Sequence, residues 1–568
     1  MSFDINYMVG GEAGQGVQSV ALLLGKALAG AGCRVFGDQD YESRVRGGHN
    51  FFRVRASDAP VKAIDEEVDV LVALNAESVH LHVSEVGRSG AIIYDNERTK
   101  GLPADPRLLG IPLQRLAVER AGNAIMTNTV ALGAALGLIS YDRSSLNDVL
   151  KKHFSGAVAD ENVAAATVGY DHARSLYKGS LAEIRVGSVA NRMLMTGNEA
   201  LSLGAIAAGC KFMAAYPMTP TTSIMEYLAA HAKECNLVMV HAEDEIAAIH
   251  MAIGASYAGV RAMTATSGSG FCLMSEGLGL AGMTETPVVI VEGQRAGPAI
   301  GFPTRTEQGD LLFLLYAHQG EFARAILAPT TIEDCFWSAV KAFNLADRYQ
   351  TAVLVLTDSF LASSFGTVEG FDLSRVVIDR GAIHTDADGD PSAYLRHKVT
   401  GDGISPRAFP GRGKTLVVTD SDEHDEAGHM TEDAGVRTAQ MDKRLRKLTS
   451  MAKEVTAPYF YGPEKADVLL IGWGSTYGAL QEAADILRRD VSARVLQLNQ
   501  VWPFPSEAVD AEIRRSKSTF VVENNATGQL ARLIRSETGN KVTGNILKYD
   551  GRPFTPAIVA SAVRREVS

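Results

Sequence analysis

Polar residues able to do chemistry follow short apolar runs at three places between residues 216 and 270. In YPMTP (216–220), two prolines restrict the backbone and give the Thr219 hydroxyl a defined direction. Glu245 opens the apolar run IAAI, which makes its carboxyl a candidate for acid–base chemistry in an apolar setting. In TSGSG (266–270), the glycines let a ligand approach backbone N–H groups.

Alternating strands and helices must position these residues. Apolar runs at 211–216 and 237–240 predict strands, and Ser223-x-x-Glu226 predicts a capping box on a helix that begins near Ser223. Ligands in open α/β sheets bind beyond the carboxyl ends of the strands, where these polar residues are expected. Each segment alone also has an ordinary explanation as a helix cap, a complement to the helix dipole or a turn. Their combination favours a functional site.

Four segments carry a resemblance to a known family. YPMTP, AEDEIAAIHMAIGASYAG, TSGSGFCLMSEGLGLAG and PTRTEQGD (303–310) resemble the α subunit of 2-oxoacid:ferredoxin oxidoreductases, which use thiamine diphosphate. The resemblance implies a pyrimidine-type thiamine domain in which Glu245 is catalytic and hydrogen-bonds the aminopyrimidine ring. A desolvated carboxyl suits that role because it can share a proton with a ring nitrogen. Glu243 is the alternative residue for the same contact.

The resemblance also implies contacts with the substrate. An arginine can hold a carboxylate through two parallel hydrogen bonds, and a threonine hydroxyl can hold an oxo group or a carboxylate. The residues implied are Thr219, Arg305, Tyr216 and Pro217 for the 2-oxoacid, and Glu245, Ser267 and Gly268 for thiamine diphosphate.

Composition excludes several other classes of protein. The 568 residues carry a formal net charge of -11 without a basic, aromatic-rich patch, so we expect no nucleic-acid binding. The first residues lack a signal-peptide pattern and no apolar run reaches membrane-spanning length, so we expect a cytoplasmic protein without a membrane role. The five cysteines are scattered, which indicates no disulfide framework and no zinc or iron–sulfur site in this chain.

The first 60 residues read as strand, glycine-rich turn, helix and strand. The turn, with Asp38 and Asp40 about twenty residues later, gives a weak dinucleotide-binding match that lacks the third glycine. GGEAGQG (10–16) and YESRVRGG (41–48) instead resemble the γ domain of the same oxidoreductases. In that case Gly14, Gln15 and Gly16 would cradle an anion such as a phosphate of coenzyme A, although a tight turn without a ligand explains them equally well.

The last 200 residues offer two segments that invite a metal interpretation. The GDG segment at 401–403 looks like the start of a magnesium-diphosphate motif, but no Asn follows about thirty residues later. His424 and His429 lie five residues apart in an expected loop, which is typical of solvated polar groups. We therefore assign no metal ligand to this chain. Three possible cations for a distal substrate carboxylate are Arg396, His397 and Arg407.

The complete prediction is a multidomain α/β protein. It comprises a γ-type α/β domain (1–185), a pyrimidine-type thiamine-diphosphate-fold domain (193–370), an irregular linking region (371–460) and a transketolase C-terminal-like domain (461–568). The resemblance implies the α(γ) subunit of a 2-oxoglutarate:ferredoxin oxidoreductase that forms succinyl-CoA and CO2 reversibly, with electrons passed to ferredoxin. Pyruvate or a branched-chain 2-oxoacid is the alternative substrate; an NAD-dependent dehydrogenase and a non-catalytic scaffold are the alternatives from other classes.

The prediction extends to cofactors and partners. Because this chain offers neither a magnesium-diphosphate motif nor a cysteine cluster, a separate β subunit is expected to supply Mg2+ and a [4Fe-4S] cluster and to share the thiamine diphosphate. Coenzyme A is the expected cosubstrate, and (αβ)2 is the expected assembly, a heterotetramer.

Overall fold

The computed structural model describes residues 3–43, 47–184 and 191–567. The chain forms two compact units: one comprises Met1–Met195, Ser363–Gly370 and Thr555–Ala557, and the other comprises the rest. Among the described residues, no helix combines the length and the apolar character that crossing a membrane requires.

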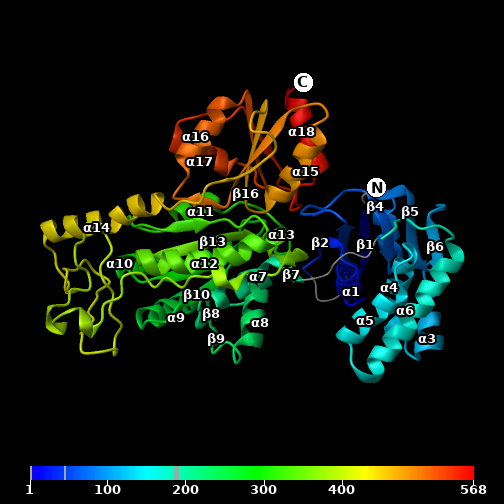
Figure 1. The fold of residues 1–568 in the computed structure, drawn as a ribbon, viewed down its shortest axis with the longest axis horizontal. Coiled ribbons are helices and arrows are strands. Elements are labelled where there is room, and N and C mark those ends of the chain that lie inside the picture. The colour runs from blue at the N-terminus through cyan, green and yellow to red at the C-terminus, as the bar shows by residue number, and fades with distance from the viewer. Residues whose placement is uncertain (1–2, 44–46, 185–190, 568) are drawn as a thin grey trace. The chain divides into compact units, whose positions relative to one another are not determined.

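The first unit is built on a mixed eight-stranded sheet in the order β6-β5-β4-β1-β3-β2-β14-β7 (Figure 1). β1 is parallel to β4, whereas β3 lies antiparallel between β1 and β2. The strands are β1 Asp4–Glu12, β2 Arg34–Asp40, β3 His49–Ser57, β4 Val68–Ala73, β5 Val86–Asp95, β6 Leu108–Ile111, β7 Arg192–Thr196 and β14 Phe365–Glu369. The helices are α1 Val17–Gly30, α2 Ala76–His82, α3 Leu113–Ala121, α4 Thr127–Gly137, α5 Arg143–His153 and α6 Gly156–Leu176.

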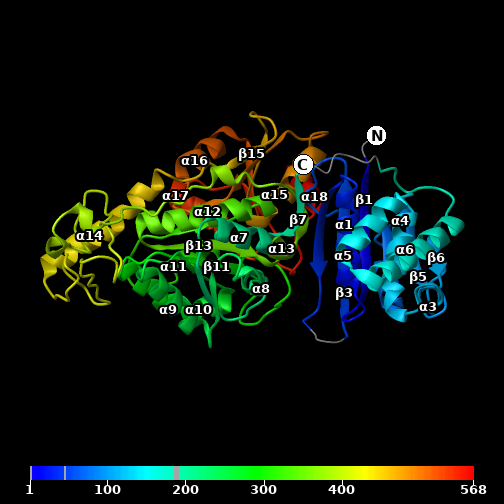
Figure 2. The ribbon, with the colours of Figure 1, turned by 60° about the horizontal axis from the view of Figure 1, so that its bottom comes forward.

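Small residues let the long helices of this unit pack closely (Figure 2). A β-carbon on Gly133 of α4 would lie 2.0 Å from the carbonyl oxygen of Ala166, and one on Gly169 of α6 would lie 2.0 Å from that of Val130. Glycine is therefore required on both faces. The alanine-rich composition of these helices reflects backbone contact.

The second unit contains a seven-stranded sheet in the order β18-β12-β13-β11-β10-β8-β9. The strands from β12 to β9 run parallel, and β18 lies antiparallel to β12 at one edge. The strands are β8 Phe212–Ala215, β9 Val238–His241, β10 Ala262–Thr266, β11 Val288–Gln294, β12 Ala325–Leu327, β13 Ala352–Asp358 and β18 Gln500–Trp502. The helices are α7 Gly197–Ala207, α8 Thr222–His231, α9 Glu245–Tyr257, α10 Gly268–Met283, α11 Leu311–Tyr316, α12 Ile332–Tyr349 and α13 Ser359–Ser363.

A five-stranded sheet, in the order β15-β17-β16-β19-β20, completes the second unit. One buried apolar cluster includes residues near both sheets, among them Leu354 of β13 and Trp473 of β16, so the two sheets share a core. The strands are β15 Tyr459–Tyr461, β16 Val468–Trp473, β17 Ala493–Leu498, β19 Ser518–Glu523 and β20 Gly544–Leu547, and the helices are α14 Ala434–Ala452, α15 Tyr477–Leu487, α16 Ser506–Arg515, α17 Gln529–Thr538 and α18 Pro556–Val567.

The multidomain α/β class is confirmed, and so are the strands predicted at 211–216 and 237–240. The predicted capping box is wrong: Thr221 is the residue before α8 and makes no side-chain cap, while Ser223 accepts a hydrogen bond from Asn198 Nδ2 at 2.8 Å. A capping box does occur in this unit, between Thr196 and Glu199 at the start of α7. The four-part division of the chain stays a prediction.

Candidate functional site

Four neighbouring parallel strands bring the predicted site segments to one edge of the sheet. β9, β8, β10 and β11 are adjacent, so the segments that follow them, 242–245, 216–220, 267–270 and 295–310, all leave from their carboxyl ends. This is the edge at which ligands bind in open α/β sheets.

Glu245 is the first residue of α9 and is 3% exposed. Its neighbour Asp244 caps the helix by accepting a hydrogen bond from Ala247 N at 2.8 Å, which leaves the Glu245 carboxyl for another role. Oε1 of Glu245 is buried and has no hydrogen-bond partner within the described parts of the chain. A buried carboxylate oxygen without a partner is costly, so it marks a position built for a ligand. Glu243 is exposed to solvent, which separates the two candidate glutamates by environment.

Gly270 keeps the space beside this carboxyl open. A β-carbon at position 270 would lie 2.4 Å from Glu245 Oε1 and 2.1 Å from Thr266 Oγ1. The second glycine of the TSGSG turn is therefore needed for close approach to Glu245.

The YPMTP segment contacts the two segments beside it. Ser269 Oγ donates to Met218 Sδ at 3.4 Å, and Arg295 Nη1 donates to the carbonyl oxygen of Thr219 at 3.0 Å. Tyr216 is 40% exposed and Pro217 is partly buried at the end of β8. The structure thus joins Thr219, the glycine-rich turn and the β11 segment in one site.

A pocket of about 330 Å³ opens between these segments. Ser267 and Gly268 line it, as does Arg295. The Ser267 hydroxyl is buried and, among the described residues, has no hydrogen-bond partner. The complete lining is Ser267, Gly268, Ser269, Cys272, Arg295, Gly297, Pro298, Ala299, Asp310 and Phe313.

Two carboxyl groups lie behind the pocket wall. Burial and the neighbouring Asp310 raise the pKa of Glu292 well above its ordinary value. Burial also raises the pKa of Asp310 to about 6, against the opposing effects of its hydrogen bond with Glu292 and of Arg295. The two carboxyls share a proton at neutral pH and together carry about one negative charge.

The PTRTEQGD segment is held against the five-stranded sheet through Gln308. Its backbone N–H donates to Asn524 O at 2.6 Å, its side chain donates to Trp473 O at 2.9 Å, and Asn525 Nδ2 donates to its carbonyl oxygen at 3.0 Å. The side chain of Arg305 lies beside Gly551, where an added β-carbon would be 3.0 Å from Arg305 Cβ. Arg305 does not line the pocket, within the described part of the chain.

The three cations considered for a distal carboxylate serve internal contacts instead. Arg396 donates to Gln350 Oε1 at 3.0 Å, and Arg407 Nη2 lies 2.7 Å from Asp347 Oδ1. His397 is paired with Glu285 at 2.9 Å, and burial lowers its pKa to about 2. The expectation that these side chains face the substrate is therefore wrong for this pocket: each is at most 3% exposed and none lines it.

The glycine-rich turn of the first unit is tied down by its own chain. Gly14 and Gly16 have φ values of 91° and 77°, and Asn128 Nδ2 donates to the Gln15 carbonyl oxygen at 2.8 Å. Asp38 accepts two hydrogen bonds from Arg53, at 3.1 and 2.9 Å, so its carboxylate is engaged and does not favour the dinucleotide reading. Anion binding by this turn stays a prediction, and its companion segment YESRVRGG lies partly outside the described residues.

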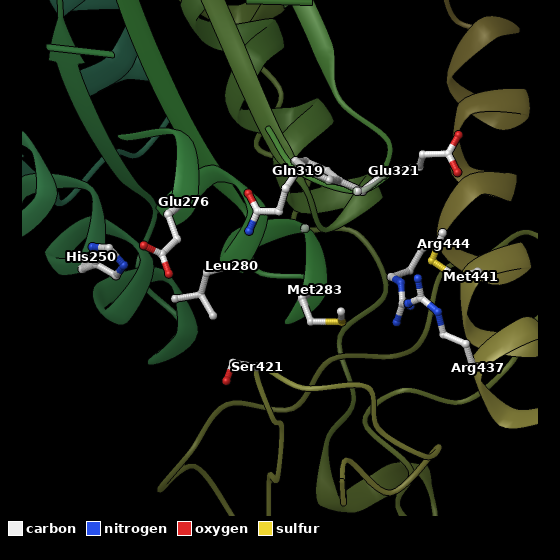
Figure 3. Close-up of a pocket in the computed structure, with 14 residues that line it drawn as sticks. His250, Glu276, Leu280, Met283, Gln319, Glu321, Ser421, Arg437, Met441 and Arg444 are labelled. Carbon is white, nitrogen blue, oxygen red and sulfur yellow. The ribbon is translucent and has the colours of Figure 1, made fainter. Parts of the chain in front are cut away.

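A second pocket, of about 390 Å³, lies between α10 and α14 and contains none of the predicted site residues (Figure 3). Arg437 and Arg444 on its α14 side both pair with Glu423. Its charged groups are thus largely engaged in internal pairs.

Sequence reasoning missed Arg295, Asp310 and Glu292 as neighbours of the site. The signal was present, because Arg295 directly follows an apolar strand in the same way as Thr219 does. The role of Gln308 left no comparable signal, since its partners lie more than 150 residues away along the chain.

Family models match three successive parts of the chain. The model described as pyruvate ferredoxin/flavodoxin oxidoreductase matches residues 6–172, and the model described as pyruvate:ferredoxin oxidoreductase core domain II matches residues 466–559. Between them, residues 203–443 match the thiamine-diphosphate-binding domain of pyruvate flavodoxin/ferredoxin oxidoreductases. The candidate site lies within this thiamine-diphosphate-binding domain.

Relatives similar over nearly the whole chain agree with these matches. The α subunit of a 2-oxoacid:ferredoxin oxidoreductase from Sulfolobus sp is 34% identical and is matched over 97% of this chain and 95% of its own length. The 2-oxoglutarate synthase subunit KorA of Methanothermobacter thermautotrophicus is 35% identical over 65% of this chain and 96% of its own length. The solved structure of 2-oxoglutarate:ferredoxin oxidoreductase from Magnetococcus marinus, with 2-oxoglutarate, coenzyme A and succinyl-CoA bound, is 33% identical, with a TM-score of 0.93 and 100% coverage of both chains.

Proposed function

Because the chain belongs to the 2-oxoacid:ferredoxin oxidoreductases as an α subunit, we propose that it provides the aminopyrimidine-binding half of a thiamine-dependent site for oxidative decarboxylation of 2-oxoglutarate. The observation that carries the proposal is the buried, unpartnered Oε1 of Glu245 beside Gly270. The substrate is supported by the names of two relatives, the KorA subunit and the Magnetococcus marinus enzyme.

The side chains present fit thiamine diphosphate. Glu245 offers an unsatisfied carboxylate oxygen in an apolar setting, which suits a ring nitrogen that exchanges a proton. Gly270 leaves room for a flat ring to approach that oxygen. When bound, thiamine diphosphate supplies the carbanion that adds to the 2-oxo carbon and accepts the electrons left by the loss of CO2.

The chain's own residues bind, orient and hold a proton. Glu245 holds a proton at Oε1 and positions the ring. The Thr219 hydroxyl and the Arg305 guanidinium orient the 2-oxoacid, with Tyr216 and Pro217 shaping the same segment. Ser267 and Gly268 contact the ligands from the N-terminus of α10.

The remaining components belong to partners. A β subunit supplies Mg2+, the diphosphate site and a [4Fe-4S] cluster, and passes electrons to ferredoxin in an (αβ)2 assembly. Coenzyme A accepts the acyl group, with the Gly14–Gly16 turn as a candidate phosphate cradle. Pyruvate or a branched 2-oxoacid is the alternative substrate, because several relatives carry only the general 2-oxoacid name.

The test is reduction of a viologen dye by this chain co-expressed anaerobically with its β subunit. Coenzyme A-dependent reduction is expected with 2-oxoglutarate, at a higher kcat/KM than with pyruvate or 2-oxoisovalerate. A higher kcat/KM with pyruvate would replace the substrate, and silence with every 2-oxoacid in an iron- and thiamine-loaded complex would contradict the proposed function.

A further inference from the structure

Arg295 is a cation at the site to which neither the sequence motifs nor the similar proteins assign a role. It follows β11, lines the 330 Å³ pocket and is anchored by its hydrogen bond from Nη1 to Thr219 O at 3.0 Å. The anchor fixes the guanidinium beside the threonine that the proposed function places on the substrate. An arginine keeps its charge at neutral pH even when burial lowers its pKa, as it does here.

The N-terminus of α10 faces the same pocket. This helix of 16 residues begins at Gly268, and its unpaired backbone N–H groups and dipole favour an anion. Ser267 precedes it but does not cap it: its hydroxyl is buried in a residue only 1% exposed and has no partner in the described structure. A capping residue that leaves its own helix unserved while lining a pocket indicates a ligand that accepts from both.

The acidic groups around the pocket balance Arg295 only in part. Asp310 lies against Gly268, because a β-carbon there would be 2.5 Å from Asp310 Oδ2. Glu292 and Arg295 both interact with Asp310, and Glu307 and Cys272 are its other titratable neighbours. Since Glu292 and Asp310 share a proton, the pocket holds about one negative charge against the arginine and the helix terminus.

We propose that Arg295, Ser267 and the N-terminus of α10 form a carboxylate-binding subsite for the 2-oxoacid. This inference rests on the proposed function and deepens it. The arginine supplies a charged fork, the serine supplies one hydroxyl donor and the helix supplies N–H donors, which is a complete set for one carboxylate. The diphosphate of the cofactor is not the occupant, because the proposed function places it on the β subunit.

Two carboxylates have the required chemistry. One is the C1 carboxylate that every 2-oxoacid carries, and the other is the distal carboxylate found only in 2-oxo dicarboxylic acids. Steady-state KM and kcat for 2-oxoglutarate and for 2-oxobutyrate, measured on the assembled complex, distinguish them.

Arg295→Met should raise KM roughly 10- to 100-fold, as expected for a lost charged hydrogen bond, with a smaller change in kcat. A rise for both acids assigns the C1 carboxylate, and a rise for 2-oxoglutarate alone assigns the distal one. Arg295→Lys should recover part of the loss, because it keeps the charge but not the fork. Ser267→Ala tests the subsite without removing charge and should raise KM in the same direction by a smaller factor.

The matched control is Arg375→Met, which removes an exposed arginine outside the pocket and should leave KM unchanged. Unchanged KM for both acids in Arg295→Met and in Ser267→Ala, in complexes that turn over normally, would overturn the subsite and leave the proposed function standing. A wild-type complex silent with every 2-oxoacid would instead overturn the proposed function, and the subsite with it.

Discussion

At the scale of single residues, the environment of one carboxyl distinguishes it from its neighbours. Glu243 and Glu245 are two residues apart, yet only Glu245 is buried with an unpartnered oxygen. The sequence favours Glu245 because it starts an apolar helix face. The sequence does not reveal Gly270 as its neighbour, because that contact depends on how β10 and α9 lie side by side.

Gly270→Ala should strongly reduce turnover. The new methyl group would meet Glu245 Oε1 and Thr266 Oγ1, and overpacking of this kind costs about 1–3 kcal/mol. We expect at least a tenfold fall in kcat/KM in the viologen assay. The control is Gly254→Ala in α9, where nothing lies within 4 Å of the added carbon and activity should persist. Equal activity of the two variants would show that the space beside Glu245 is not used.

The charge of Asp310 predicts a pH dependence of substrate affinity. Its pKa is raised to about 6, so it is ionised at pH 7.5 and becomes neutral as the pH falls below about 6. Neutral Asp310 repels a carboxylate less, so KM for the 2-oxoacid should fall as the pH is lowered through 6. Asp310→Asn should remove that fall. A wild-type KM profile that is flat between pH 5.5 and 7.5 would contradict the placement of Asp310 beside the substrate.

At the scale of elements, the segment that carries Arg305 depends on a second sheet. Gln308 links it to Trp473 at the end of β16 and to Asn524 and Asn525 after β19. The sequence places strands near 468–471 and 519–522 but cannot show that their ends hold residue 308. The antiparallel strand β3 also escaped prediction, whereas the parallel strands β8 and β9 were evident from their apolar runs.

Gln308→Ala should weaken substrate binding without touching the substrate. Three partners would be left unsatisfied in a buried position, at a cost of about 1–3 kcal/mol for each lost buried hydrogen bond. We expect a lower melting temperature and a higher KM for 2-oxoglutarate. Gln319→Ala, at an exposed glutamine, provides the comparison and should change neither quantity. An unchanged KM in Gln308→Ala would mean that the segment holds its position without the second sheet.

A buried ion cluster attaches α14 to the segment between α10 and β11. Glu285 Oε1 lies 2.6 Å from Lys443 Nζ, and Oε2 lies 2.6 Å from Lys447 Nζ. Although burial alone would raise it, Lys447 and Lys443 hold the pKa of Glu285 well below its ordinary value. Glu285→Gln should destabilise the protein by about 3–5 kcal/mol, because two lysines lose their counter-ion in an apolar setting.

Hydrogen exchange along α14 and thermal unfolding measure that loss. Glu276→Gln, at an exposed glutamate of α10, is the control and should behave as the wild type. Normal protection of α14 in Glu285→Gln would show that the ion cluster does not attach this helix.

At the scale of the whole molecule, the chain combines matches to three parts of one enzyme family. The multidomain α/β class and the family were predictable from motifs, because these motifs lie at strand ends where the chemistry restricts residue types. Membership of the 365–369 strand in the first unit was not predictable, because β14 pairs with β2 more than 300 residues away along the chain. The proposed division of labour assigns the aminopyrimidine contact to this chain and the diphosphate and electron transfer to a β subunit.

The most direct test of this account compares Glu245→Gln with Glu243→Gln in the assembled complex, using coenzyme A-dependent viologen reduction with 2-oxoglutarate. The two variants remove the same charge two residues apart, one from the buried oxygen and one from the surface. Glu245→Gln should lower kcat by about 100-fold or more, as expected for loss of an acid–base group, while Glu243→Gln keeps most of the activity. Full activity of Glu245→Gln, or equal loss in both variants, would contradict the central claim that Glu245 serves the cofactor.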